Sequence, residues 1–343
     1  RYVLNLNNQT TNEHTHIYTT GARVNTFGIE GVSEHALFMK EIEHASKIRN
    51  RIIDCFETAN IPGQSENEIE RLLHFAVVGG GPSGIEFAAS LHDFLDDDMR
   101  EAYPDLTKHV HVTVVEAMDG ILRAFDPGLV KYTEGELQRE KIDLWTNTFV
   151  SRVGPESFDV KRKGEKEKIN VPCGMVVWVA GIGTRPVVSS LAKSIGKESG
   201  QNSRRGLVVN EFMQVKGTPH VWALGDCAVS GLPPTAQVAA QQGLYLGRLL
   251  NKISSNIHEN DLDITKSQSP FDYKHKGIFA YTGDGHAICQ VSTWRNDIKG
   301  TGSKAYALWA SVYWSKLLSM KNRACVGFDW FKTKAMGRDI TRR

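Results

Sequence analysis

The chain has no cysteine pattern of the kind that builds disulfide frameworks, zinc ribbons or dithiol redox centres. Its five cysteines are scattered and contain no C-x-x-C pair: Cys55, Cys173, Cys227, Cys289 and Cys325. Histidines offer no metal pattern either, because the close pairs His14/His16 and His109/His111 are isolated. The acids of residues 259–265 lack the spacing and the central glycine of an EF-hand. We therefore expect no bound metal.

Long hydrophobic runs and a strong overall charge are also missing. The longest apolar run of the C-terminal region, Tyr306–Ala310, is far shorter than the roughly 20 residues of a membrane span. The net charge of the 343 residues is only +2, but residues 316–343 hold eight basic and two acidic residues and carry +6. The remainder is then 2 − 6 = −4. A near-neutral body with a basic tail predicts contact with an anionic surface at one end, and we expect no nucleic-acid partner.

The most informative segment is a strand, a glycine turn and a helix in succession. Phe75–Val78 predicts a buried parallel strand, and Ile85–Leu95 follows a helical pattern. Between them, fitting G-x-G-x-x-G, stand Gly79, Gly80, Gly81, Pro82, Ser83 and Gly84. In this context the first glycine allows a tight turn, Gly81 lets a pyrophosphate approach the backbone, and Gly84 lets the helix pack against the strand. The helix N-terminus would bind the pyrophosphate through its free N–H groups.

A glutamate ends the next predicted strand, 110–116. The carboxylate of Glu116 can accept both hydroxyls of an adenosine ribose, whereas it would repel a 2′-phosphate, so it favours NADH over NADPH. Glu116 follows the last glycine by 116 − 84 = 32 residues, which is longer than usual. We expect the excess, residues 93–106, to be a solvated extension of the helix that ends at Pro104.

The remaining patterns indicate an α/β protein. Apolar positions at helical spacing predict an amphipathic helix over 34–60 that bridges two domains. Further strands are expected at 142–150, 157–162 and 175–180, a helix after Pro127, a helix over 235–250, a polar loop over 251–270 and a hairpin over 278–291.

The C-terminal region carries an aromatic stripe. Six residues within 304–321 recur on one helical face: Tyr306, Trp309, Ala310, Tyr313, Trp314 and Leu317. Four of the seven tryptophans follow residue 290, and basic residues flank 326–331. Clustered tryptophan beside basic residues is typical of a helix that lies in a lipid headgroup layer. A helix that packs in the core or forms a dimer is the alternative.

Seven segments spread over the chain carry a family signature: TTGARVNTFGIEGV (19–32), VVGGGPSGIEFAASL (77–91), VWVAGIGTRPV (177–187), RGLVVNEFMQVKG (205–217), VWALGDCA (221–228), LPPTAQVAAQQGLYLG (232–247) and the DW-x-K-T…GRDITR tail (329–342). Together they resemble the type II (alternative, rotenone-insensitive) NADH:ubiquinone oxidoreductases. The implied fold is an α/β, Rossmann-like flavoprotein with two dinucleotide-binding domains. The parts expected are 1–69 (remainder of the FAD domain and connecting helix), 70–186 (NADH domain), 187–292 (second part of the FAD domain) and 293–343 (membrane-anchoring region).

The resemblance implies where the two cofactors, FAD and NADH, bind. Asp226, beside Gly225, matches the residue that accepts a ribitol hydroxyl of FAD. Gly181 matches the loop where the nicotinamide domain meets the flavin. The other residues implied at FAD are Thr20, Gly21, Thr235, Ala236 and Gln237.

The resemblance also implies catalytic roles. Glu86 matches a glutamate that faces the nicotinamide and the flavin, where a buried acid with a raised pKa assists proton movement. A carboxylate that is merely satisfied by backbone donors is the alternative. Gln237 and Gln241, one helical turn apart, match positions near the flavin and the quinone headgroup, with exposed polar residues as the alternative. Some relatives carry histidine where this chain has Ala240, so proton delivery by that histidine is not available here.

The activity implied is non-proton-pumping NADH:ubiquinone oxidoreduction by a peripheral protein of the mitochondrial inner membrane, which could also form a homodimer. In the family an earlier G-x-G-x-x-G unit holds the FAD pyrophosphate, and none precedes Gly79. We therefore expect this chain to lack that segment and to bind FAD weakly without it. The alternatives are another two-domain flavoprotein, of the ferredoxin reductase or sulfide:quinone reductase type, and a non-catalytic NADH-binding remnant at a membrane. The absence of a cysteine pair disfavours the sulfide enzyme.

Overall fold

The computed structural model describes residues 15–255, 269–292, 297–317, 319–338 and 340. The chain divides into two compact units, of which unit 1 comprises residues 1–24 and 182–276 and unit 2 comprises 25–181 and 277–343. This division differs from the four expected parts, because residues 25–69 and the C-terminal region both belong to the unit that contains the glycine turn. Residues 1–14, Trp294 and most of the expected loop over 251–270 lie outside the described residues.

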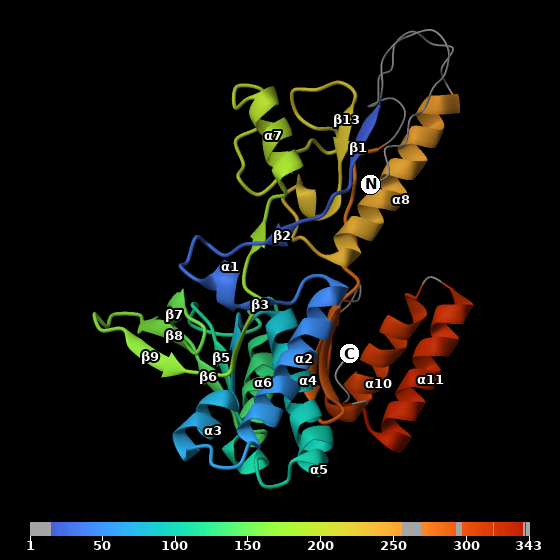
Figure 1. Cartoon of the computed structure of the whole chain (residues 1–343). Helices are drawn as coiled ribbons and strands as arrows, with labels where there is room; N and C mark the ends of the chain where they lie inside the picture. The colour runs from blue at the N-terminus through green and yellow to red at the C-terminus, as the bar shows by residue number, and fades with distance from the viewer. Residues whose placement is uncertain (1–14, 256–268, 293–296, 318, 339, 341–343) are drawn as a thin grey trace. The chain divides into compact units, whose positions relative to one another are not determined.

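A five-stranded parallel sheet forms the centre of unit 2 (Figure 1). Its strands, in spatial order, are β3 (Leu37–Phe38), β10 (Met175–Trp178), β4 (His74–Val78), β5 (His111–Val115) and β6 (Ile142–Trp145). β4 and β10 are buried along their whole length, as the apolar sequence of a central parallel strand requires. Val78 is in register with both Val115 and Trp178, so three strands end at one edge of the sheet. Ligands of doubly wound sheets bind outside this carboxyl edge.

The helices of unit 2 connect and cover these strands. Among them are α1 (Val32–His35), α2 (Ile42–Ala59), α3 (Glu66–Leu72), α4 (Pro82–Asp93) and α6 (Pro127–Arg139). The helix predicted over 34–60 is too long, because residues 37–38 join the sheet as β3 and α2 begins only at Ile42. α2 also packs on β3 and β10 within unit 2. The helix predicted after Pro127 is confirmed, with the Asp126 side chain capping its N-terminus.

The strand predicted over 142–150 is wrong as a single strand. Asn147 has a positive φ of 52°, which turns the chain after β6. Residues beyond it form a separate antiparallel sheet of β7 (Thr148–Val153), β8 (Ser157–Arg162) and β9 (Ile169–Pro172).

The C-terminal segment adds a second layer to unit 2. The predicted hairpin is confirmed and belongs to an antiparallel sheet of β15 (Ile278–Gly283), β16 (His286–Ser292) and β17 (Asp297–Thr301). β15 packs on α4, and β16 packs on α10 (Gly302–Ser315). The single helix predicted over 304–321 ends at Ser315, and α11 (Met320–Met336) runs beside α10 (Figure 1). Among the helices of the described ranges, none is both long and apolar enough to cross a bilayer.

Within its described residues, unit 1 is built from short strand pairs and two α-helices. β1 (His16–Tyr18) runs parallel to β13 (Val221–Ala223), β2 (Arg23–Val24) pairs with β11 (Ile182–Gly183), and β12 (Leu207–Val208) pairs with β14 (Ala228–Val229). Its helices are α7 (Pro186–Ile195) and α8 (Ala236–Ser255). Buried side chains of its strands and of both helices, including Val188, Leu207, Trp222 and Leu249, form a separate core.

Candidate functional site

The glycine turn joins β4 to α4 at the carboxyl edge of the parallel sheet. Gly79 has a φ of +124°, which L side chains rarely adopt. At Gly84 a Cβ would overlap the carbonyl oxygen of Gly79, so only glycine lets α4 approach the strand this closely. At Gly81 a Cβ would meet nothing within 4 Å. The turn is therefore open at Gly81, the position where a dinucleotide-binding turn meets the pyrophosphate, and Pro82 starts the helix at its favoured first position.

Glu116 lies directly beside this turn. Its Oε2 accepts the N–H of Gly80 at 2.6 Å, and its Oε1 accepts the N–H of Met118 at 2.8 Å. A Cβ on Gly80 would lie 3.0 Å from Oε2 and 2.7 Å from the side chain of Ile121, so the carboxylate needs a glycine at this position. Each carboxylate oxygen can accept a second hydrogen bond, which leaves capacity for the hydroxyls of a ribose. The structure thus adds a role that the sequence did not predict, which is to hold the turn.

Glu86 lies one turn into α4 and is part-buried. Its Oε1 accepts the backbone N–H of Tyr281 at 3.2 Å and the indole N–H of Trp309 at 3.2 Å. Burial raises the pKa of Glu86, and these two hydrogen bonds oppose part of the rise. Both features that the sequence offered as alternatives, the raised pKa and the satisfied carboxylate, are therefore present together.

A second carboxylate lies seven residues further along α4. Asp93 accepts the hydroxyl of Tyr281 at 2.6 Å and the backbone N–H of Asp284 at 3.0 Å. Burial raises the pKa of Asp93, and burial with the neighbouring Asp93 raises the pKa of Tyr281. Sequence reasoning missed Asp93, although its spacing of two helical turns from Glu86 places both acids on one face of α4.

The acidic extension after α4 is helical, as predicted, but it is only partly solvated, because Leu95, Asp98 and Met99 are buried. It consists of a π-helix, η1 (Phe94–Met99), followed by α5 (Arg100–Ala102). The side chain of Asp98 is only 5% exposed and pairs with Arg338 of the C-terminal tail, whose backbone N–H and Nη1 both donate to it at 2.6 Å. Arg338 also reaches Asp97 at 3.3 Å. One of the basic residues assigned to a membrane-facing tail is therefore bound within unit 2.

In unit 1, the residues predicted at FAD follow two parallel strands. β1 and β13 run side by side, and the segments with Thr20–Gly21 and Gly225–Asp226 come directly after them. Gly21 and Gly225 have φ values of +64° and +70°, and a Cβ at Gly21 would meet nothing within 4 Å. The N–H of Gly225 donates to the buried side chain of Gln242 at 2.8 Å, a partner that the sequence did not indicate. This pair of turns, open at Gly21, fits a cofactor placed at the strand ends.

The N-terminus of α8 is the third part of the predicted FAD site. The helix begins at Ala236, and Thr235 caps it, with Oγ1 accepting the N–H of Val238 at 3.3 Å. The 20-residue helix has a developed dipole, whose N-terminus favours negative charge.

Gln237 and Gln241 both hold the extended segment 271–276. Oε1 of Gln237 accepts the hydroxyl of Tyr273 at 3.0 Å and the N–H of Lys276 at 2.7 Å. Gln241 donates to the carbonyl of Lys274 at 2.9 Å and accepts its N–H at 3.0 Å. Neither side chain is simply an exposed polar group, and their predicted contacts with flavin and quinone stay predictions.

An open cavity of about 490 Å³ borders this part of unit 1. Its lining includes Ser230 and Tyr273, which are hydrogen-bonded to Gln242 and Gln237 respectively. The lining also carries charged side chains of both signs, Glu211, Lys216 and Asp272. The volume is that of a small-molecule site. Two hydrogen bonds join the lining of the cavity to α8, the helix predicted to bind the flavin.

Packing within unit 2 requires a glycine at position 181. Its φ is +77°, and a Cβ there would lie 2.5 Å from the ring of Phe27 and 3.2 Å from the Cβ of Asn25. The carbonyl of Asn25 also accepts the indole N–H of Trp178 at 3.0 Å. The predicted role of Gly181 beside NADH stays a prediction.

The aromatic stripe of the C-terminal region divides between two environments. Tyr306 and Trp309 pack against the antiparallel sheet, which is the alternative of core packing. The N–H of Trp314 donates to the carbonyl of Arg323 at 2.9 Å and so links α10 to α11. Tyr313 and Trp314 of the stripe are exposed on α10, and further large apolar side chains are exposed on α11: Met320, Phe328, Trp330, Phe331 and Met336.

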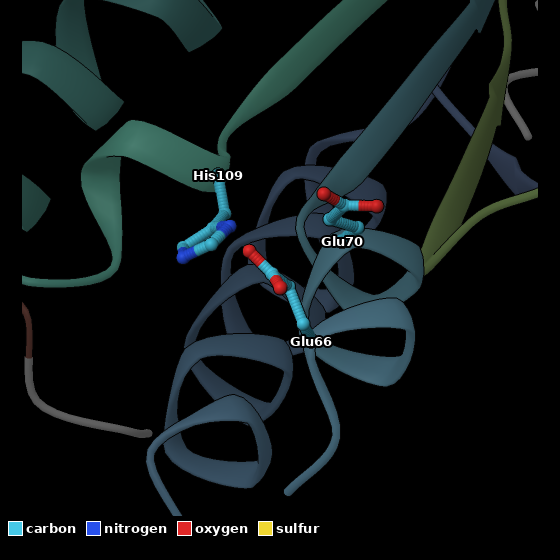
Figure 2. Close-up of side chains that lie close together, drawn as sticks. All are labelled: Glu66, Glu70 and His109. Carbon is cyan, nitrogen blue, oxygen red and sulfur yellow. The ribbon is translucent and has the colours of Figure 1, made fainter.

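Three side chains of metal-binding type lie close together in the described residues. Figure 2 shows Glu66 and Glu70 on α3 beside His109, with one ligand atom of each within 4.8 Å of the others. Both glutamates are exposed, and no ion pair joins either of them to His109 among the described residues. Exposed groups of this kind are common without an ion, and the expectation of no metal site stays a prediction.

Comparisons with known proteins agree with this geometry. The family model of the pyridine nucleotide-disulphide oxidoreductases matches residues 3–243, and the model of the NDH2 C-terminal domain matches residues 275–339. The structure of NDH2 from Plasmodium falciparum in complex with NADH superposes with a TM-score of 0.86 at 26% identity, covering 95% of this chain and 79% of that chain.

Curated relatives extend the match. The mitochondrial external alternative NADH-ubiquinone oxidoreductase of Yarrowia lipolytica is 39% identical, over 94% of this chain and 61% of that protein. The mitochondrial external alternative NAD(P)H-ubiquinone oxidoreductase B1 of Arabidopsis thaliana is 32% identical, over 95% of this chain and 72% of that protein. The chain thus spans about six-tenths of the length of the Yarrowia lipolytica relative.

Proposed function

Because the chain belongs to the pyridine nucleotide-disulphide oxidoreductases, and among them to the alternative NADH-ubiquinone oxidoreductases, we propose that it oxidises NADH with ubiquinone, without proton pumping. The reaction takes NADH, one proton and ubiquinone to NAD⁺ and ubiquinol. FAD, when bound, takes the hydride and passes two electrons to the quinone. The observation that carries the proposal is the glycine turn, open at Gly81 and flanked by Glu116.

NADH binds to unit 2 in this proposal. The open backbone at Gly81 and the N-terminus of α4 hold the pyrophosphate. Glu116 accepts the adenosine ribose hydroxyls with the lone pairs that Gly80 and Met118 leave free, and its charge disfavours a 2′-phosphate. The chain is therefore selective for NADH over NADPH.

FAD binds to unit 1. Thr20, Gly21, Gly225 and Asp226 supply the turns at the ends of β1 and β13, and the first turn is open at Gly21. The N-terminus of α8, at Thr235–Ala236, would favour negative charge on the flavin ring when FAD is bound. Gln237 and Gln241 form the polar surface that receives the quinone headgroup, and the hydroxyl of Tyr273 fixes the amide of Gln237.

Glu86 supplies the proton function. Burial raises its pKa, and a carboxyl whose proton affinity is raised in this way can serve as a general acid or base. Ala240 offers no titratable group, so we assign the proton function to Glu86.

The C-terminal helices place the protein at a membrane surface. The exposed apolar side chains of α11 stand beside basic residues of the same helix, among them Lys321, Lys332 and Lys334. Apolar and cationic side chains together bind an anionic lipid interface without crossing it. The relatives are named as mitochondrial proteins, and we assign this chain to the periphery of the mitochondrial inner membrane. A homodimer would use the same exposed helix.

Three assays of the complete natural protein test the proposal. Two use NADH as the electron donor, with a short-chain ubiquinone or ferredoxin as the acceptor. The third uses sulfide as the electron donor and the ubiquinone as the acceptor. We expect NADH-dependent ubiquinone reduction, no ferredoxin reduction and no sulfide oxidation. Liposomes with and without anionic lipid test the membrane assignment, and high salt should release the protein only partly, because apolar insertion is not screened. Ferredoxin reduction without quinone reduction would contradict the proposal and assign the chain to the ferredoxin reductase type.

A further inference from the structure

The carboxylate of Glu86 is held by a segment that lies far from it in the sequence. Both of its donors, the N–H of Tyr281 and the indole N–H of Trp309, come from the C-terminal layer of unit 2. Both donate to the same oxygen, Oε1. Among the described residues no donor to Oε2 is found, and this leaves Oε2 as the oxygen that can carry a proton or meet a ligand.

The indole that donates to Glu86 has a fixed orientation. The ring of Trp309 lies 4.8 Å from that of Tyr313, 5.6 Å from that of Tyr281 and 5.7 Å from that of Tyr306, measured between centroids. Three aromatic contacts, two of them within α10 and one to β15, restrict the rotation of the indole. Its N–H therefore points at Oε1 because α10 is packed on the antiparallel sheet.

The aromatic cluster is itself attached to α4 at a second point. Tyr281, which packs on Trp309, donates its hydroxyl to Asp93 at 2.6 Å. Asp93 and Glu86 lie on the same face of α4, two turns apart. The C-terminal layer is thus bound to the helix of the glycine turn through two carboxylates, and Trp309 is the only side chain of α10 that contacts Glu86 by a hydrogen bond in the described residues.

We propose that Trp309 is a positioning residue for Glu86, whose indole N–H fixes the carboxylate and so connects the α10–α11 helices to the start of the NADH-binding helix. This inference rests on the proposed function, in which Glu86 handles a proton and α11 contacts the membrane. It gives the aromatic stripe of α10 a role at the site in addition to packing. A shift of α10 would move the donor away from Oε1 and change the proton affinity of the carboxyl.

Other ionisable groups face this cluster in the described residues, and the charges of Asp97 and Arg338 act on Asp93 from outside it. Asp93 is on α4, Tyr281 is on β15, and Tyr306 and Tyr313 are on α10. Burial raises the pKa of Tyr281 and of Tyr313, so neither ionises near neutral pH. Asp93 is the carboxyl of this cluster, in the described ranges, whose titration could be mistaken for that of Glu86, and Asp93→Asn separates the two.

A readout that does not depend on turnover is the indole N–H resonance of Trp309 in the complete protein with ¹⁵N-labelled tryptophan. Its loss in Trp309→Phe assigns it. We expect the resonance to shift with pH as Glu86 titrates, to be flat in Glu86→Gln and to keep its shift in Asp93→Asn. A Trp309 resonance that is indifferent to pH and to Glu86→Gln would overturn the proposal.

The second readout is the pH profile of flavin reduction by NADH. Trp309→Phe keeps an aromatic ring but removes the donor, so it should move the acidic limb upward by about one pH unit. Trp314→Phe is the matched control, because its indole donates to Arg323 instead, and the limb should stay in place. A uniform loss of rate at every pH in Trp309→Phe would mean a structural role and overturn the inference. If the unmodified protein does not reduce its flavin with NADH at all, the proposed function fails, while the resonance experiment still decides the inference.

Discussion

Two alanine substitutions in the glycine turn should affect different properties, NADH binding at Gly81 and stability at Gly84, because the two glycines have different surroundings. At Gly81 the backbone has a φ of −74° and a ψ of 176°, an extended conformation open to any residue. A Cβ there points into space with nothing within 4 Å. At Gly84 a Cβ would overlap the carbonyl oxygen of Gly79 and lie 2.9 Å from its carbon. These are backbone atoms, and they cannot move aside without displacing β4 or α4.

The magnitudes follow from these surroundings. Gly81→Ala should change the free energy of unfolding by less than about 1 kcal/mol, because no atom is displaced. It should weaken NADH binding roughly 10- to 100-fold, the loss of one charge-assisted hydrogen bond to the pyrophosphate at about 1.5–3 kcal/mol. Gly84→Ala should cost more than about 4 kcal/mol and lower Tm by roughly 10 °C or more.

Thermal unfolding and NADH titration of the two variants, at a temperature where both are folded, measure these effects. The comparison separates binding from stability, because each variant is the control for the other. Gly81→Ala that binds NADH as tightly as the unmodified protein would refute the assignment of the pyrophosphate to this turn. Gly84→Ala with an unchanged Tm would refute the close approach of α4 to β4.

Four further substitutions test other contacts. Glu116→Gln should shift the kcat/KM ratio toward NADPH by roughly 10- to 100-fold, since about 1–3 kcal/mol of like-charge repulsion is removed, and an unchanged ratio would take Glu116 out of the ribose site. Because the pKa of Glu86 is raised in the folded state, its contribution to stability is present at low pH and is lost as pH rises through the folded pKa. Glu86→Gln should therefore raise Tm at pH 8 but not below the ordinary carboxyl pKa of 4.5. Equal Tm values of the variant and the unmodified protein at pH 8 would contradict this. Arg338→Gln leaves the buried carboxylate of Asp98 without its partner and should lower the free energy of unfolding, measured with urea, by about 1–3 kcal/mol. This figure is reduced for solvent screening because Arg338 is 37% exposed. Adding Asp98→Asn to the Arg338→Gln variant should recover part of the loss. Gln237→Leu should slow reoxidation of the reduced flavin by ubiquinone while leaving flavin reduction by NADH nearly unchanged, and a parallel fall in both steps would give Gln237 a structural role.

The features predicted correctly from the sequence are those fixed by short-range chemistry. The strand, turn and helix around Gly79–Gly84 were predictable because apolar runs, glycine and proline act on adjacent residues. The same holds for the helix capped by Asp126 and for the hairpin around Asp284. The Rossmann-like flavoprotein fold, inferred from the order of such segments, is confirmed by the family model and by the superposed NDH2 structure.

The features that could not be predicted depend on long-range packing. Trp309 follows Glu86 by 223 residues, and no local pattern indicates that its indole reaches α4. Arg338 was counted as a surface charge for the same reason, since its partner Asp98 lies 240 residues away in a segment that reads as polar. The strand breaks at Asn147 because this single residue has a left-handed backbone conformation. The residues on both sides of it favour strands, so the sequence does not indicate the break.

The central claim, that NADH reduces a flavin which ubiquinone then reoxidises, is tested most directly by an anaerobic titration of the complete natural protein. We predict that one equivalent of NADH bleaches the visible flavin absorbance, that ubiquinone restores it in a second and separate step, and that Gly81→Ala raises the NADH concentration needed for the first step without affecting the second. A protein that binds NADH without flavin bleaching, or whose bleached flavin is not restored by ubiquinone, would contradict the account.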